Sequence, residues 1–205
     1  MVGPRSRRPL RTAYRVTTSV GVALHELAHK WFAEERGLAI HEVVYFQLDN
    51  PAGYVRHETP TSYRALLSVA LAPFLVNTAV AAAAFGAADW LRRVRGFASF
   101  SPATWVAFGL LLWLGVACGL HAFPSRTDLA TVGPRARVGN SNHRRLRSWL
   151  TTIAGVVLVF PLLVVLNACT RTQRYGSHVG YTLVVYWLAS LAVEQYLTAL
   201  TPLLR

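Results

Sequence analysis

Long apolar segments alternate with short polar ones along this chain. Three stretches of 24, 30 and 23 residues contain no Asp, Glu, Lys or Arg, and they occupy 65–88, 96–125 and 148–170. Each is longer than the roughly 20 residues with which a helix crosses the hydrocarbon core of a bilayer. The pattern therefore predicts membrane-spanning helices over about 64–91, 101–123 and 147–169.

Two further segments are candidates for membrane spans. The segment of about 179–203 is apolar apart from Glu194 and carries aromatic residues near its start, as is usual at a membrane interface. A helix over about 11–36 also has apolar stretches, but it contains a cluster of His and Glu residues. Such a cluster is costly in hydrocarbon, so this helix spans only if something compensates for the polar side chains.

The polar segment after the first helix has the composition of a β-hairpin. Residues 40–48 are rich in β-branched and aromatic types, Asn50-Pro51-Ala52-Gly53 is typical of a turn, and a second short run begins at Tyr54. We therefore predict a hairpin over about 39–58. The fold class expected for residues 1–205 is a single all-α polytopic membrane domain, with about five transmembrane helices and this small hairpin between the first two.

Composition and charge agree with a multi-pass integral membrane protein. Of the 205 residues 53% are hydrophobic and 15% charged, and the net charge of +12 comes from arginines clustered next to the predicted spans. This distribution is expected of loops that meet anionic lipid, so we predict the bilayer as a partner and no nucleic acid. In either topology, some of the arginine clusters break the rule that positive charges lie on the cytoplasmic side, so the membrane orientation stays open. The oligomeric state stays open as well.

The sequence His25-Glu26-Leu27-Ala28-His29 matches the H-E-x-x-H pattern of zinc hydrolases. Residues four apart share one face of a helix, so both imidazoles can bind one ion. Glu26 lies beside them and can act as general base towards water that the ion activates. A bound metal also compensates for ionisable groups in an apolar helix. We therefore predict one Zn²⁺ per chain.

A third ligand must come from another segment, and three carboxylates lie near predicted span ends. Asp89 precedes Arg92 and Arg93 by three and four residues, so a surface ion pair explains it without a metal. Glu194 lies among apolar residues and can serve as a structural hydrogen-bonding group. Asp128 follows a break at Pro124 and Ser125, where a carboxylate can turn inward, and is the favoured candidate.

Together these features resemble the site-2 protease family of intramembrane zinc metalloproteases. The resemblance rests on the H-E-x-x-H helix, the hairpin with Gly53, Pro73 and Asn77 in the next span, and the break before Asp128. It implies His25, His29 and Asp128 as zinc ligands, Glu26 as base and transmembrane segments as substrates. The later motif of the family usually reads Asp-Gly after an Asn, whereas this chain has Leu129 after Asp128 and carries His121 about where the Asn would be. The chain therefore resembles a divergent, minimal member of the family.

Two other polar residues have alternative roles. His121 can donate to the oxyanion formed during hydrolysis, replace Asp128 as ligand, or cap a helix end. Asn77 can orient the substrate or hydrogen-bond a neighbouring helix. The hairpin, in turn, either holds an extended substrate by β-augmentation or is a packing loop.

These residues predict an intramembrane zinc-dependent endopeptidase that acts on a membrane protein substrate. One alternative is a non-catalytic membrane scaffold or binding protein that keeps a metalloprotease-like zinc site. Retention of Glu26 argues against it, because a structural site needs no base. A transition-metal carrier ranks last, because it should show several ionisable groups spread across the spans, and only Glu194 and His121 fit that expectation.

Overall fold

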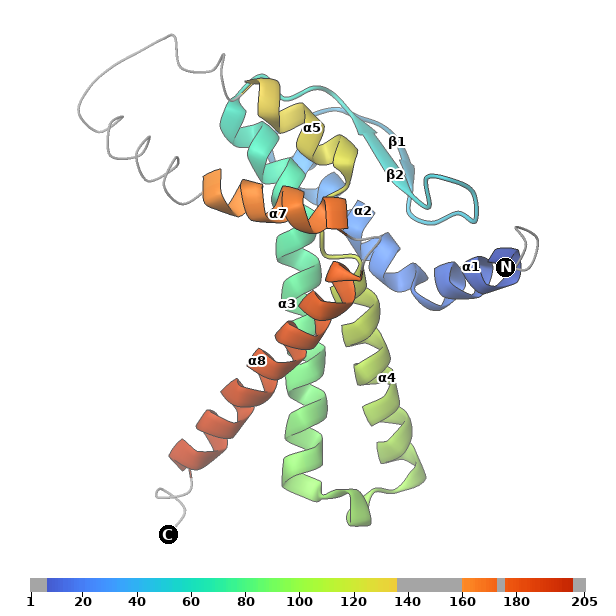
Figure 1. The fold of residues 1–205 in the computed structure, drawn as a ribbon, viewed down its shortest axis with the longest axis vertical. Helices are drawn as coiled ribbons and strands as arrows, with labels where there is room; N and C mark the ends of the chain where they lie inside the picture. The colour runs from blue at the N-terminus through green and yellow to red at the C-terminus, as the bar shows by residue number, and fades with distance from the viewer. Residues whose placement is uncertain (1–6, 136–159, 173–175, 201–205) are drawn as a thin grey trace.

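The computed structural model describes residues 7–135, 160–172 and 176–200. Most of them are helical, and two strands form a small antiparallel sheet. In chain order the elements are α1 (Arg7–Thr17), α2 (Ser19–Glu35), β1 (Ile40–Val44), β2 (Tyr54–His57), α3 (Tyr63–Arg95), η1 (Phe97–Ser99), α4 (Pro102–Leu120), α5 (Arg126–Arg135), α7 (Phe160–Thr172) and α8 (Ser177–Leu200) (Figure 1). The predicted helical class with a small hairpin is thus confirmed.

Three of these helices, α3, α4 and α8, are long and apolar enough to cross a membrane. They correspond to the spans predicted over about 64–91, 101–123 and 179–203. The span predicted over about 147–169 lies largely outside the described residues, and α7 covers only its end. The count of five spans therefore stays a prediction, and the described part of the chain supports membrane association through three helices.

The helix predicted over about 11–36 is two helices, which meet at Thr18. The Thr18 hydroxyl donates to the carbonyl oxygen of Tyr14, and such a bond to the preceding turn bends a helix. The same hydroxyl lies 2.9 Å from Nε2 of His121, at the end of α4. Thr18 is thereby held in place, and α1 leaves in a different direction from α2 (Figure 1).

The central helix α3 packs against α2, α4 and α8. Small residues allow these close approaches. A Cβ on Gly21 of α2 would collide with the carbonyl oxygen of Ala117 in α4, and one on Gly115 would lie 2.5 Å from the Phe85 ring. A buried apolar cluster, consisting of Ala81, Phe85, Cys118 and Val185, joins α3, α4 and α8. Close helix packing through small residues is typical of membrane proteins.

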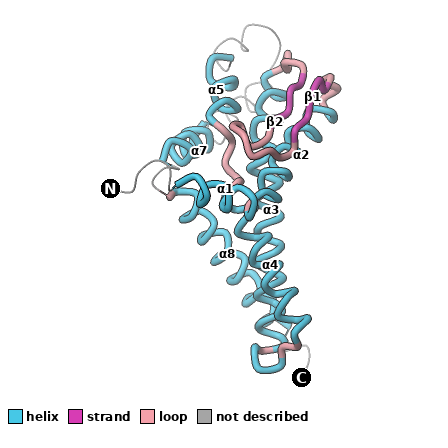
Figure 2. Tube along the Cα trace, turned by 90° about the vertical axis from the view of Figure 1, so that its right-hand side faces the viewer, coloured by secondary structure: helices cyan, strands magenta, loops and turns pink. Residues whose placement is uncertain are grey.

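The hairpin predicted over about 39–58 is present as β1 and β2. Val43 pairs with Val55 and Val44 with Tyr54, and the register shifts between Ile40 and Glu42. Across the strands, Glu42 accepts hydrogen bonds from the Tyr54 hydroxyl at 2.6 Å and from Arg56 at 3.0 Å. The hairpin lies beside α2, at the same end of the molecule as α5 (Figures 1 and 2).

Candidate metal centre

Helix α2 presents His25 and His29 one turn apart on its packed face. Their rings lie edge to face with centroids 5.0 Å apart, and His29 is buried. The face is inward because Gly21, Val22 and Ala28 are buried with them against α3 and α4. The sequence spacing therefore delivers both imidazoles to one place in the protein interior, as predicted.

Each imidazole is oriented by a backbone carbonyl. His29 Nδ1 lies 2.9 Å from the carbonyl oxygen of Val69, and His25 Nδ1 lies 2.9 Å from that of His121. A carbonyl only accepts, so both Nδ1 atoms carry the hydrogen and both Nε2 atoms keep a lone pair. This is the arrangement in which a histidine binds a metal through one nitrogen while its other nitrogen fixes the ring.

Each of the two acceptor carbonyls lacks the N–H partner that it would usually have within its own helix. Val69 lies four residues before Pro73 in α3, and proline has no N–H with which to close that turn. His121 follows the last residue of α4, where carbonyls lack partners in their own helix. The sequence signal for both was visible in Pro73 and in the predicted helix end, although neither carbonyl was predicted as a partner.

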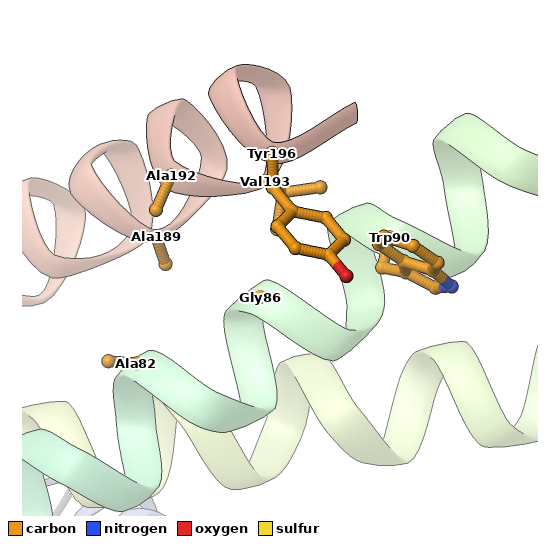
Figure 3. Close-up of a pocket in the computed structure, with 7 residues that line it drawn as sticks. All are labelled: Ala82, Gly86, Trp90, Ala189, Ala192, Val193 and Tyr196. Atoms are coloured by element: carbon orange, nitrogen blue, oxygen red, sulfur yellow. The ribbon is translucent and has the colours of Figure 1, made fainter. Parts of the chain in front are cut away.

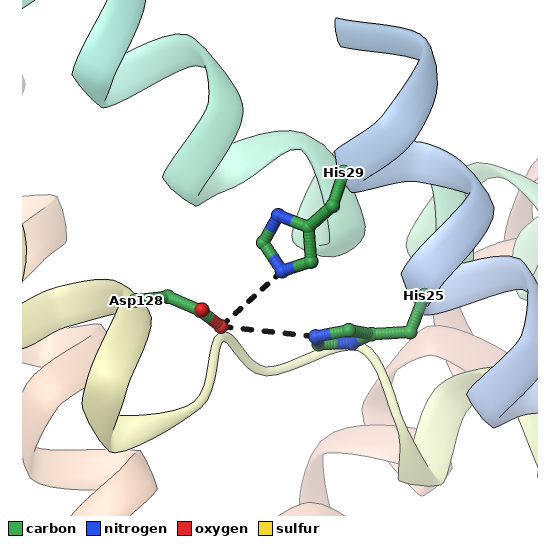
Figure 4. A group of neighbouring side chains, drawn as sticks. All are labelled: His25, His29 and Asp128. Carbon is green, nitrogen blue, oxygen red and sulfur yellow. Dashed lines mark ion pairs between the residues drawn. The ribbon is translucent and has the colours of Figure 1, made fainter. Parts of the chain in front are cut away.

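Asp128 enters the group from the first turn of α5 (Figure 4). Its Oδ2 lies 3.3 Å from His29 Nε2 and 3.8 Å from His25 Nε2. Ligand atoms about 2.1 Å from a tetrahedral ion lie about 3.4 Å apart, so both distances to Oδ2 are close to that spacing, and all three ligand atoms lie within 4.8 Å of one another. Within the described residues, these three side chains form a group that could hold a metal.

The loop before α5 fixes the Asp128 carboxylate. The Ser125 N–H donates to Asp128 Oδ2 at 2.7 Å, and the Asp128 N–H donates to Ser125 Oγ at 3.2 Å. This reciprocal cap starts the helix and aims the carboxylate. Burial opposes ionisation of Asp128, but when His25 and His29 are protonated, their hydrogen bonds to Asp128 outweigh the effect of burial and hold the pKa of Asp128 below its usual range.

Glu26 lies next to the hairpin and next to the group formed by His25, His29 and Asp128, the metal-type group. Its side chain is only 8% exposed. Gly53, just before β2, is so close that an added Cβ would lie 2.8 Å from Glu26 Cγ and 3.0 Å from the carbonyl oxygens of Val44 and Tyr45. The hairpin therefore covers the proposed base, a contact that sequence reasoning did not predict.

The side chains of His121 and Asn77 bond to neighbouring parts of the protein and are not part of the group of His25, His29 and Asp128. The His121 ring hydrogen-bonds Thr18, while its backbone ends α4. Asn77 is fully buried and donates through Nδ2 to the carbonyl oxygens of Gly21 and His121, at 3.3 and 3.0 Å. Both amide hydrogens of Asn77 are thus engaged in joining α3 to α2 and to the end of α4.

The two carboxylates that were weighed against Asp128 lie towards the far end of α3 and α8. Asp89 forms the predicted ion pairs with Arg92 and Arg93, but it is buried and not at the surface as predicted, and it accepts a hydrogen bond from Ser190 at 3.0 Å. Glu194 pairs with Arg93 at 3.1 Å. Neither carboxylate belongs to the metal-type group of the described residues.

A separate pocket of about 380 Å³ lies between α3 and α8 (Figure 3). Its lining residues are Ala82, Gly86, Trp90, Ala189, Ala192, Val193 and Tyr196. None of these carries an ionisable group that titrates near neutral pH, so the pocket has no hydrolytic chemistry of its own. It belongs to the apolar surface of two candidate membrane spans.

Comparison with models of known protein families, with curated proteins and with solved structures gives no match for this chain. The assignment of function therefore rests on the site itself.

Proposed function

We propose that the protein is an intramembrane zinc-dependent endopeptidase, similar to the site-2 protease family. It cleaves a transmembrane or membrane-adjacent segment of another protein. The observation that carries the proposal is the approach of Asp128, from α5, to Nε2 of both His29 and His25, at 3.3 and 3.8 Å. With Glu26 beside them, these residues supply three ligands and a base, the set that a hydrolytic zinc site needs.

The donor set fits zinc, because two neutral imidazoles and one carboxylate leave a fourth tetrahedral position for water. Zinc held by His25, His29 and Asp128 would supply Lewis-acid chemistry, which lowers the pKa of water and polarises a carbonyl. Val69 and His121 hold the imidazoles in the tautomer that binds through Nε2. Glu26 takes a proton from the attacking water and passes it to the leaving amine nitrogen.

The surroundings of the site favour a membrane protein as substrate. Three neighbouring helices are long and apolar enough to cross a bilayer. A peptide bond inside a substrate helix is protected by its own hydrogen bonds and must become extended before attack. Within the described residues, each strand of the two-stranded hairpin has an unpaired edge, and Gly53 places this hairpin against Glu26. Backbone pairing along one of these strand edges can hold the extended substrate segment.

Metal content is the first test. Purified wild-type protein should contain about one zinc per chain, and His25→Ala and Asp128→Ala should each lose it. His41→Ala is the matched control, because His41 lies in β1 and is not part of the group. Zinc retained at wild-type levels in both ligand variants would contradict the site.

Proteolysis is the second test. New protein N-termini within or beside transmembrane segments should appear in membranes that contain the wild type and not in those that contain Glu26→Gln, which should keep its zinc. Glu34→Gln is the control, since Glu34 lies on the same helix and pairs only with the surface residue Lys30 among the described contacts. Cleavage that survives Glu26→Gln would refute the mechanism. A zinc-loaded wild type without cleavage products would favour the non-catalytic scaffold.

A further inference from the structure

Helix α1 is strongly amphipathic and carries arginines at positions 7, 8, 11 and 15. At about 100° per residue, Arg11 and Arg15 lie on one side, Leu10 and Ala13 on the other, and Tyr14 at the edge of the apolar side. The apolar side chains are not covered by the described protein, since Leu10 is 73% exposed and Tyr14 44% exposed. A basic helix with an uncovered apolar side is typical of helices that lie in a membrane interface.

The position of α1 coincides with one end of a candidate span. Helix α4 has 19 residues and is therefore about 28 Å long, close to the thickness of the hydrocarbon core, so its ends lie near the two boundaries. The Tyr14 ring lies 6.1 Å from that of His121, which follows the last residue of α4. Helix α1 runs across the long axis of α3 and α4 (Figures 1 and 2), as an interfacial helix does.

The basic side of α1 faces the hairpin. Arg15 donates from Nη1 to the carbonyl oxygens of Leu48 and Asp49, the second at 2.9 Å. The hairpin loop lies on one side of α1 and the body of α4 extends away on the other (Figure 1). Arg15, and Arg11 on the same side of the helix, therefore lie towards the level of the lipid headgroups, whereas Leu10 lies on the opposite side.

We propose that α1 is a binding surface for anionic lipid in the leaflet nearer the metal-type group. The arginines supply charge complementarity to the headgroups, and Leu10 and Tyr14 supply apolar area at the boundary. Each arginine near an anionic surface strengthens binding about fivefold. Because Arg15 also holds the hairpin loop, lipid binding by α1 fixes the place of the loop relative to the membrane. The proposal does not depend on protease activity.

The test uses the full chain, reconstituted in vesicles of phosphatidylcholine alone or mixed with phosphatidylglycerol. Cys118 and Cys169 are replaced by Ala, and a single spin label is attached at Leu10→Cys or at Thr12→Cys on the polar side. Collisions of the label with oxygen, which concentrates in lipid, and with a water-soluble nickel complex are compared. In mixed vesicles the label at 10 should meet oxygen and the label at 12 nickel, and in phosphatidylcholine alone both should meet nickel more often.

Charge reversal separates lipid binding from other contacts. Arg11→Glu should shift α1 at least about fivefold from lipid towards water in mixed vesicles. Arg95→Glu is the control, because it makes the same charge change on an exposed residue at the other end of α3. A label at 10 that is in water in both vesicle types, or that is equally buried with and without phosphatidylglycerol, would overturn the proposal. So would a label shielded from both reagents, which would indicate that protein covers α1.

Discussion

His29 Nδ1 lies 2.9 Å from the carbonyl oxygen of Val69, the acceptor that Pro73 leaves without a donor in its own helix. The proline thus contributes to the metal centre from a position outside the ligand group, by keeping one backbone oxygen available. A residue that breaks the hydrogen-bond ladder of α3 also completes the shell around a ligand of α2.

Pro73→Ala should therefore change stability and metal affinity in opposite directions. Alanine supplies an N–H that competes with His29 for the Val69 oxygen, so zinc affinity should fall about 10- to 100-fold. Proline costs about 3 kcal/mol more than alanine in a helix interior, so α3 should become more stable. Chelator competition and thermal unfolding without metal measure the two effects.

Pro102→Ala is the control for this experiment, because Pro102 begins α4, where a missing N–H costs nothing. It should leave zinc affinity unchanged. Equal zinc affinity in Pro73→Ala and wild type would refute the idea that Pro73 keeps the Val69 oxygen available to His29.

Gly53→Ala should impair catalysis more than metal binding. The new Cβ would meet Glu26 Cγ at 2.8 Å and two backbone oxygens of the hairpin at 3.0 Å, so the hairpin and the base must move apart. Misplacing a catalytic group by about 1 Å can cost about 100-fold in rate. Cleavage and zinc content are measured together. Gly109→Ala, at a position with open space, is the matched control, and equal loss of both properties would indicate general unfolding instead.

Arg15→Gln should loosen the hairpin loop and leave the strands paired. Arg15 joins α1 to the carbonyl oxygens of Leu48 and Asp49, whereas the pairing of Val43 with Val55 does not involve it. A spin label at Asn50 should become more mobile in this variant. Arg36→Gln makes the same change in charge and in side chain at the end of α2 and should not alter the label. An unchanged label at 50 in Arg15→Gln would show that the loop is held by other contacts.

The hairpin should also lose stability in acid. Hydrogen bonds from Tyr54, and then from Arg56, hold the pKa of Glu42 below its ordinary value of 4.5. A carboxylate with a lowered pKa stabilises the fold above its ordinary pKa, and the contribution disappears as pH falls through the lowered value. Label mobility at Asn50 should therefore rise below about pH 4.5. Glu42→Gln should remove this pH dependence, and a profile identical to wild type would refute the role of Glu42.

Much of the fold follows from local pattern, whereas the division at Thr18 does not. The charge-free stretches predict α3 and α4, and the turn at Asn50-Pro51-Ala52-Gly53 predicts the hairpin, because these signals lie within single segments. At Thr18 the hydroxyl bonds locally to Tyr14 and also contacts His121, more than 100 positions away. The pattern of apolar and polar residues over positions 1–36 gives no sign of the contact with His121.

The candidate site divides in the same way. His25 and His29 follow from helical spacing, and Asp128 was favoured because it follows a helix break, where the structure places it against both histidines. The carbonyls of Val69 and His121 were missed because every residue has one, and only the fold selects which are used. The approach of Gly53 to Glu26 was missed because it depends on how the hairpin packs against α2, which only the fold determines.

The reliance on backbone oxygens has a consequence for which substitutions this chain can tolerate. The atom that orients His29 belongs to position 69, yet it is present whatever side chain stands there. Position 73, by contrast, is restricted to proline, because any other residue would bring a backbone N–H that competes for the Val69 oxygen. Zinc affinity should therefore be sensitive to substitution at position 73, which contributes no ligand, and insensitive to the kind of side chain at position 69, whose oxygen orients one.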